Sequence, residues 1–211
     1  MATRLVDLTQ PLTPGMAVLP GDPPLTASPH LTHAIDGFSL TTLCMSTHTG
    51  THVDAPFHLL PEGATLDRFP LSRFVGQARV LDVRRPAVTA IDIGDLDGPW
   101  SGVDMCLLWT GWDAHYGTET MVDHPFLTPE AAATLRDAGM RLVGTDAPSL
   151  DPILGPHYPV HELLLGADVL LVENLCHLDE LGPGPVSCAF LPLALVGADG
   201  SPVRAAAWVE E

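Results

Sequence analysis

The sequence predicts a single α/β or α+β domain with a β-rich centre and few helices. Its apolar runs are mostly short and bounded by Gly, Pro or Asp, which is typical of buried strands. The 19 Gly and 21 Pro residues are scattered as turn residues, and we find neither a linker-like tract nor an internal repeat. With 211 residues, 46% of them hydrophobic, the chain can form one full-size core, so we expect residues 1–211 to be one domain.

The strands are predicted from these apolar runs. Residues 38–46 are rich in β-forming side chains and stop at a segment that contains glycine, which predicts a strand leading into a loop. Further short runs predict buried strands at 78–83, 103–109, 141–144, 169–172 and 186–191.

Two helices are predicted between the later strands. The first has Thr128 as N-cap, Pro129 at the first helical position, helix-forming residues over 131–138, and Gly139 just past its end. A second, shorter helix is expected over 159–165, with Gly166 ending it.

The charged residues exclude several function classes. The chain has a formal charge of -17 and no lysine, so it cannot form a Schiff base with pyridoxal phosphate or supply a Walker A lysine. Such an acidic chain would repel a phosphate backbone and an anionic membrane surface, so we expect neither nucleic acid nor membrane as a partner.

The remaining bulk features favour the cytoplasm. The longest apolar run, 188–198, is interrupted by Pro192 and falls short of the roughly 20 residues of a spanning helix. The first residues lack the apolar segment of a signal peptide, so we expect a cytoplasmic protein. Its four cysteines contain no C-x-x-C pair, and we expect them to be reduced and mostly buried.

Residues 48–58 carry the strongest chemical signal. This segment holds His48, His52, Asp54 and His58, a set of nitrogen and oxygen donors that suits a divalent metal. In an extended segment residues i and i+2 point the same way, so His52 and Asp54 can face one ion. Gly50 lets the backbone turn so that His48 can join them.

Other interpretations of these residues are weaker. The His-x-x-x-His spacing alone is a weak motif, since His157 and His161 repeat it, and single histidines are often ordinary turn or surface residues. A zinc-protease helix needs Glu after the first His, and a serine hydrolase needs Gly-x-Ser-x-Gly; both patterns are absent from the sequence. A cysteine nucleophile stays open at Cys44 or Cys176, although a thiol inside an apolar run is usually inert.

The segment from His48 to His58 resembles the H-x-G-T-H-x-D-x-P-x-H signature of the metal-dependent cyclase family, which includes bacterial kynurenine formamidases and isatin hydrolases. The resemblance continues almost from end to end, at residues 7–12, 20–22, 110–113, 144–152, 161, 173–175 and a terminal strand over 197–205. It implies a swivelling β/β/α fold and a homodimer or homotetramer with residues of one subunit near the other's site.

Carried over residue by residue, the resemblance implies a metal held by His48, His52 and Asp54. Asp54 would bridge to a second ion held by His161 and Glu173. Zinc is the first expectation, as one or two ions, and manganese the second. His58 would transfer protons, as suits an imidazole near neutral pH.

Substrate recognition is where the chain departs from the family. In the formamidases an aromatic residue usually precedes Pro-Gly-Asp, whereas this chain has Leu19, which cannot stack on an aromatic ring. Trp112, Tyr158 and Phe38 are the aromatic residues that could compensate, although each is more often core or rim packing.

The sequence therefore predicts a hydrolase that uses metal-activated water to cleave a C–N amide bond in a small aromatic or cyclic substrate. One alternative is a cyclase or dehydratase that uses the same metal to polarise a carbonyl of a polyketide-like intermediate. The other is a metal-dependent small-molecule-binding protein without turnover.

Overall fold

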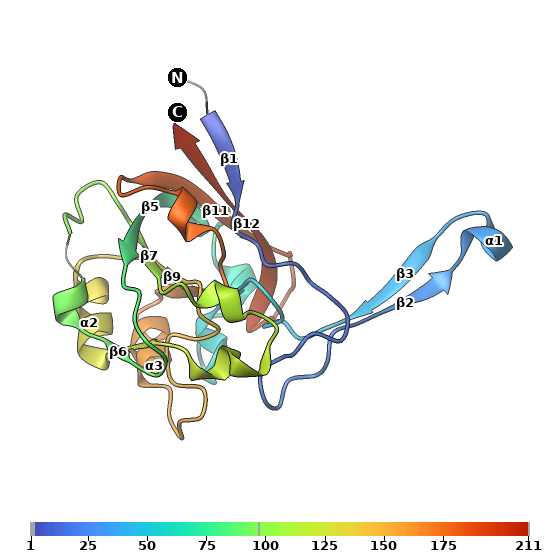
Figure 1. Cartoon of the computed structure of the whole chain (residues 1–211), viewed down its shortest axis with the longest axis horizontal. Coiled ribbons are helices and arrows are strands. Elements are labelled where there is room, and N and C mark those ends of the chain that lie inside the picture. Colours follow the sequence, from blue (N-terminus) through green and yellow to red (C-terminus); the bar gives the residue numbers. More distant parts are fainter. Residues whose placement is uncertain (1–2, 97, 211) are drawn as a thin grey trace.

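The computed structural model describes residues 3–96 and 98–210, and its centre is a closed, mixed barrel of seven strands (Figure 1). The barrel order is β12-β11-β5-β7-β9-β10-β4, and β4 pairs back onto β12 to close the ring. β12 is long enough to pair with β4 at its start and with β1 at its end. These strands are β1 (Thr3–Asp7), β4 (His52–Asp54), β5 (Val75–Asp82), β7 (Met105–Trp109), β9 (Leu142–Thr145), β10 (Leu170–Glu173), β11 (Val186–Pro192) and β12 (Gly200–Glu210).

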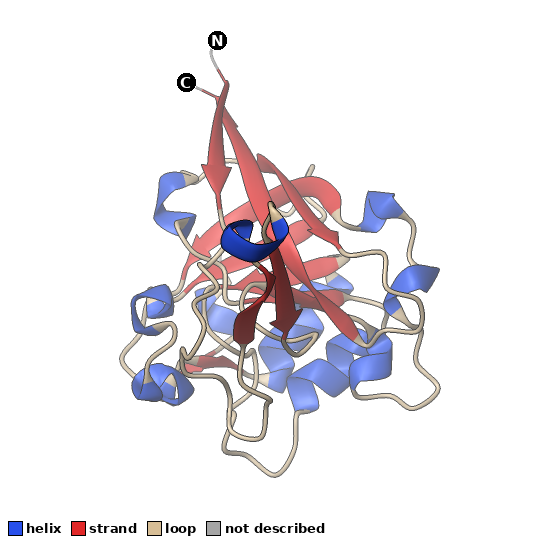
Figure 2. Ribbon diagram, turned by 90° about the vertical axis from the view of Figure 1, so that its right-hand side faces the viewer, coloured by secondary structure: helices blue, strands red, loops and turns tan. Residues whose placement is uncertain are grey.

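Four of the seven barrel strands run parallel, and two helices lie in the connections between them. β5, β7, β9 and β10 run parallel, and parallel neighbours need a crossover connection. α2 (Pro129–Asp137) lies between β7 and β9 in the chain, and α3 (Pro159–Leu165) between β9 and β10. Several helical segments lie together below the strands, and shorter ones lie at the sides (Figure 2). A small parallel pair, β6 (Ala90–Ile91) and β8 (Phe126–Leu127), lies outside the barrel.

Three of the parallel strands, β7, β9 and β10, are buried on both faces, which explains their nearly continuous apolar runs, whereas β5 is partly exposed. In β7, Met105 and Leu107 belong to the core inside the barrel, which also contains Phe190. The alternate residue Leu108 belongs to a second core, outside the barrel, where it is grouped with Leu135 of α2 and other helix residues. One face of each strand therefore fills the barrel and the other supports the helices.

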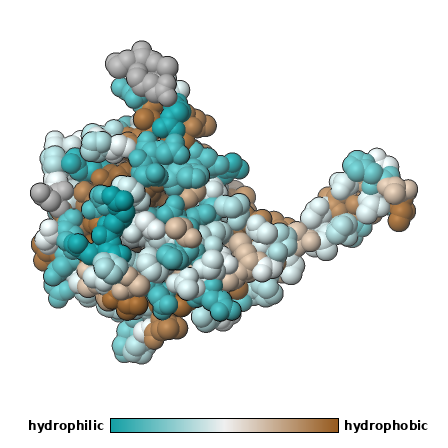
Figure 3. Space-filling view, viewed as in Figure 1, coloured by the Kyte–Doolittle hydropathy of each residue, from teal (hydrophilic) through white to brown (hydrophobic). Residues whose placement is uncertain are grey.

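A hairpin projects from the barrel (Figure 1). It consists of β2 (Thr26–Leu31) and β3 (Leu40–Cys44), with the single-turn helix α1 (His33–Asp36) at its tip. All of β3 is exposed, and apolar side chains lie near the tip, where Ile35 is 86% and Phe38 54% exposed (Figure 3). The hairpin has no strand neighbours outside its own pair in the described part of the chain.

The predicted elements agree with the structure except at particular boundaries. A strand lies in each of the six predicted runs, both helices are confirmed, and Thr128 caps α2 by accepting a hydrogen bond from the Ala131 N–H (3.2 Å). The terminal strand expected over 197–205 instead begins at Gly200 and continues to Glu210, because pairing with β1 extends it.

Three of the four cysteines are buried, as expected, and one is not. Burial raises the pKa of Cys106, Cys176 and Cys188 to about 12, which disfavours the thiolate that a nucleophile needs. The expectation of burial is wrong for Cys44, which is exposed on the projecting hairpin.

Among the residues that the structure describes, no helix has the length and apolar character needed to cross a membrane.

Candidate metal centre

The signature segment forms a tight turn followed by a barrel strand. Gly50 takes a φ of +72°, a conformation that glycine adopts without strain, and the chain then enters β4. Val53 points into the core inside the barrel. Because side chains alternate along a strand, His52 and Asp54 point to the opposite, outer face.

Asp54 is the centre of the cluster. Its Oδ1 lies 2.7 Å from His48 Nδ1 and 3.3 Å from His52 Nε2. Its Oδ2 lies 3.7 Å from His161 Nε2. The Asp54 carboxylate, only 1% exposed, therefore faces three imidazoles from two separate parts of the chain.

The other part of the cluster comes from the neighbouring β10 and from α3. Glu173, the last residue of β10, lies opposite His52 in the antiparallel β10–β4 pairing. Its Oε1 is 3.2 Å from His161 Nε2 and its Oε2 is 3.5 Å from His52 Nε2. α3, which carries His161, packs near β10, so the barrel and a helix jointly enclose the site.

Two of the imidazoles are held by their far nitrogens. His52 Nδ1 donates to the Gly50 carbonyl (2.8 Å), and His161 Nδ1 donates to Asp151 Oδ2 (2.7 Å). Asp151 is itself held by the N–H groups of Val160 and His161. Both Nε2 atoms are therefore left facing Asp54 and Glu173, an orientation typical of histidines that bind metal.

The charges of these imidazoles and carboxylates shift one another's pKa values. Burial opposes protonation of His48, but the Asp54 and Asp199 carboxylates outweigh it and raise its pKa to about 9. Burial likewise opposes protonation of His52 and His161, and neighbouring carboxylates again raise both pKa values. Burial alone would raise the pKa of Asp54, but the surrounding imidazoles hold it well below its usual value.

These residues fit a divalent cation. Asp54 Oδ2 is buried and has no hydrogen-bond partner among the described residues, although a buried carboxylate oxygen normally has one. His52, Asp54 and Glu173 are all buried and can bring one donor atom each within 4.8 Å of the others. An ion among them would satisfy the unpaired oxygen and balance the buried negative charge.

His58 lies beside this cluster and is more exposed. Its ring centroid is 4.0 Å from that of His48, and its Nδ1 is 3.7 Å from Asp199 Oδ2. Burial lowers its pKa, and charge on His48 and His161 adds to that effect despite an opposing contribution from Asp54. His58 is therefore the imidazole best suited to remain neutral and accept a proton at neutral pH.

The cluster forms the floor of a cavity of about 290 Å³. Leu19 and Tyr158, two of the expected substrate contacts, line its wall together with Asp22, Ile153 and Leu154. Trp112 is not among the residues of this wall. It is buried, and its indole N–H donates to the Met121 carbonyl (3.0 Å).

The structure also brings three residues to the site that sequence reasoning did not select: Asp22, Asp151 and Asp199. All three fall in stretches that carry the family resemblance. Their proximity to the histidines could not be read from spacing, because Asp199 lies 151 positions from His48 in the sequence.

Comparison with known proteins gives consistent matches. The Cyclase family model matches residues 6–152. Curated kynurenine formamidases from Salinibacter ruber (205 residues aligned, 95% of each chain) and Geobacillus thermodenitrificans (210 residues, 98% of each) are both 38% identical to this chain. The solved structure of isatin hydrolase A from Labrenzia aggregata, bound to benzyl benzoate, is similar with a TM-score of 0.87 and 29% identity, covering 99% of this chain and 94% of that one.

Proposed function

This chain belongs to the Cyclase family, and from that premise we propose that it is a kynurenine-formamidase-like hydrolase that cleaves a C–N amide bond with a metal bound by the cluster around Asp54. The observation that carries the proposal is the convergence of imidazoles and carboxylates at the floor of a substrate-sized cavity. Such a cavity, mostly apolar with a few convergent polar groups, is typical of small-molecule sites.

The metal ligands we propose are His48, His52, Asp54, His161 and Glu173. Asp54 has one oxygen toward His48 and His52 and the other toward His161, which supports a bridging role if two ions bind. Nitrogen and carboxylate donors suit zinc first and manganese second. When bound, the ion would polarise the amide carbonyl and make water a stronger acid.

His58 performs the proton transfer in this proposal. Asp199 faces its Nδ1, so Nε2 is the nitrogen free to accept a proton from the attacking water. The same atom then returns the proton to the leaving nitrogen, which makes the amine a better leaving group. The floor histidines His52 and His161 stay fixed meanwhile, because their Nδ1 atoms are already engaged.

The substrate proposed is a small aryl formamide, with N-formylkynurenine as the reference compound. The aliphatic residues Leu19, Ile153 and Leu154 and the aromatic Tyr158 offer the wall against which a ring could pack. Trp112 does not line this wall and would act only indirectly, through the packing of its neighbouring loop.

The test is hydrolysis of N-formylkynurenine by the zinc-loaded, manganese-loaded and chelated protein. We expect a metal-dependent kcat/KM of about 10⁴ M⁻¹s⁻¹ or more, in the ordinary range of enzymes. His52→Ala should lose both the metal and the rate, whereas His157→Ala, an exposed histidine of the second His-x-x-x-His pair, should retain both.

Two results would contradict the proposal. One is a His52→Ala protein that keeps its metal and its rate. The other is a product that gains no oxygen from labelled water, because hydrolysis adds solvent oxygen whereas cyclisation or dehydration does not.

We also propose that the chain forms a homo-oligomer through its projecting hairpin. A two-stranded hairpin is marginally stable alone in water, and this one exposes Ile35, Phe38, Leu40 and Leu43. Packing against a second copy would bury these side chains.

A further inference from the structure

Asp22 lies in the cavity wall at the end of a tight turn. Its N–H donates to the Leu19 carbonyl (3.0 Å), with Pro20 and Gly21 at the two central positions. Gly21 takes a φ of +100°, as the third residue of a type II turn requires. Because the turn fixes both of its ends, Leu19 and Asp22 line the cavity together.

The Asp22 carboxylate has no partner within the described parts of the chain. The side chain is half-buried, and neither a hydrogen bond nor an ion pair involves its oxygens. Water can reach the oxygens of this half-buried side chain, and a cation or hydrogen-bond donor that enters the cavity can take the place of that water. The cavity wall therefore offers an unused negative charge to whatever enters.

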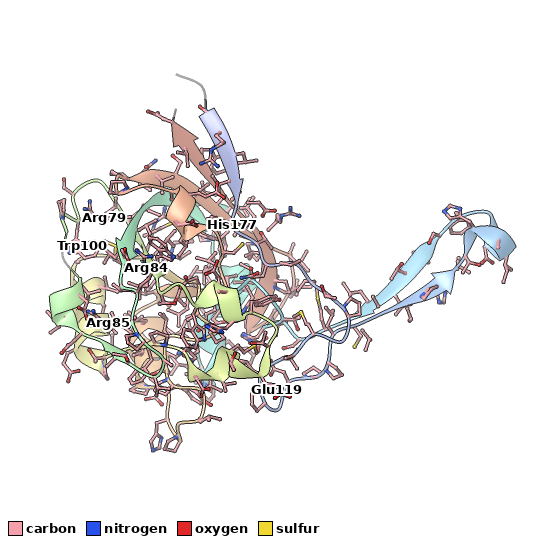
Figure 4. The ribbon with its side chains drawn as sticks, in the orientation of Figure 1. Arg79, Arg84, Arg85, Trp100, Glu119 and His177 are labelled. Atoms are coloured by element: carbon pink, nitrogen blue, oxygen red, sulfur yellow. The ribbon has the colours of Figure 1, made fainter. Side chains whose placement is uncertain are left out.

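The wall beside Asp22 has no lysine or arginine that could compete for that charge or bind an anion, and the imidazoles of the cavity belong to the metal-site cluster at its floor. The chain has no lysine, and no arginine is among the described residues that line the cavity. Arg79, Arg84 and Arg85 lie beside β5 and β7, on the side away from the hairpin (Figure 4). Arg84 is paired with Asp82 and Arg85 with Asp95.

The whole chain reinforces this local preference. A formal charge of -17 produces a negative potential that raises the local concentration of cations and lowers that of anions. An ammonium group at the Leu19–Asp22 turn would thus find a carboxylate partner, whereas a free carboxylate at the same turn would find no lysine or arginine of this chain.

From these observations we infer that Asp22 is a specificity-determining residue, which selects amide substrates carrying an ammonium group on the arm that reaches the Leu19–Asp22 turn. The inference rests on the proposed function and adds the charge of the substrate to it. Purely anionic aryl amides are poor substrates on this basis, and neutral ones are intermediate.

The test measures binding separately from hydrolysis, with a matched pair of ketones as probes. The two probes are 1-(2-aminophenyl)propan-1-one, which is neutral, and its 3-amino derivative, which differs only by an ammonium group. Titration calorimetry with metal-loaded protein should show that the wild type binds the ammonium probe about tenfold more tightly.

Asp22→Asn keeps the shape of the side chain and removes its charge, and should abolish most of this preference. Glu130→Gln is the matched control, since it removes one negative charge from an exposed position on α2, outside the cavity. It should leave the preference intact. Equal affinities in the wild type, no binding of either probe, or a preference that survives in Asp22→Asn would each overturn the inference.

Hydrolysis of the two probes, each formylated on its aniline nitrogen, gives the second readout. The ratio of their kcat/KM values should fall about tenfold in Asp22→Asn, mostly through KM, because the ammonium lies away from the reacting amide. The absence of metal-dependent hydrolysis of both formamides would defeat the proposed function itself. Hydrolysis of both with an unchanged ratio would defeat only the role of Asp22.

Discussion

Asp54 shows how one side chain organises the site. Its two oxygens face different imidazoles, and Oδ2 has no hydrogen-bond partner among the described residues. A carboxylate in this position is stable only when positive charge surrounds it, whether from protonated histidines or from a cation. The metal-free and metal-bound states therefore differ mainly in which positive charge balances Asp54.

The position of the His48 ring depends on Gly200 of β12, the strand that pairs with β4 to close the barrel. A Cβ at Gly200 would lie 2.8 Å from His48 Cε1 and 2.8 Å from the Val53 carbonyl oxygen. We predict that Gly200→Ala displaces His48, weakens metal binding about tenfold, and lowers the free energy of unfolding by about 1–3 kcal/mol. Calorimetric metal titration and urea unfolding measure these effects.

Gly184→Ala is the control for that substitution, since nothing lies within 4 Å of the added Cβ. Unchanged metal affinity and stability in Gly200→Ala would mean that the ring adjusts without loss, and that its position is not set by this contact.

The role of His58 can be separated from that of the proposed metal ligands by its own substitution. We predict that His58→Gln lowers kcat by about 10²–10⁴-fold, the usual range for loss of a general acid–base group. The metal content, measured by elemental analysis, should not change, because the buried donor set of His52, Asp54 and Glu173 is intact. Loss of metal together with activity would instead make His58 a ligand.

At the scale of elements, β4 and the hairpin have opposite surroundings. β4 has only three residues, all buried, and it pairs with both β10 and β12. β3 follows the hairpin tip with every residue exposed. The paired strands of the barrel therefore hold the residues of the candidate metal centre, while the hairpin is exposed and available for contact with another molecule.

The hairpin's role in assembly is testable by removing its apolar surface. We predict that the double variant Ile35→Ser, Phe38→Ser shifts the protein from oligomer to monomer, because it removes the apolar area that association would bury. Light scattering during size-exclusion chromatography measures the mass. Val196→Ser serves as control, since Val196 is 89% exposed but lies outside the hairpin. A monomeric wild type would refute the proposed assembly.

For the whole molecule, the buried histidines make the stability of the metal-free protein depend on pH. The pKa of His48 is raised from 6.5 to about 9 in the folded state, so folding favours its protonated form. This contribution is complete below pH 6.5 and is lost as the pH rises through about 9. The raised pKa values of His52 and His161 act in the same direction.

We therefore predict that the free energy of unfolding of the metal-free protein falls between pH 6.5 and 9, with ~3 kcal/mol as the upper limit from His48. Urea unfolding at several pH values gives the profile, and His48→Asn should reduce its slope, because only His52 and His161 then contribute. Metal binding should add more stability at the high end, because the ligands must be deprotonated. A flat wild-type profile would show that the histidines are not charged in the folded protein.

Local patterns in the sequence determined much of this protein. The runs that became β7, β9 and β10 were predictable because strands buried on both faces are nearly continuously apolar. Those that became β5 and β11 were predictable as short apolar runs bounded by turn-forming residues. α2 was predictable from its cap, its single proline and the glycine that follows it, and the donor-rich segment from His48 to His58 from residue types within a few positions. The resemblance of that segment to a family signature added His161 and Glu173, and the swivelling name for the fold stays an expectation.

Only the tertiary structure decided what these local patterns face. Closure of the barrel through β4 and β12 brings Asp199 to His48, and α3 brings Asp151 behind His161, across long separations in the chain. The exposure of β3 and the position of Asp22 in the cavity wall likewise depend on which other elements pack against them. Periodicity and composition can be read from one segment at a time. Burial and charge pairing depend on which other segments pack against it, and only the folded chain determines these.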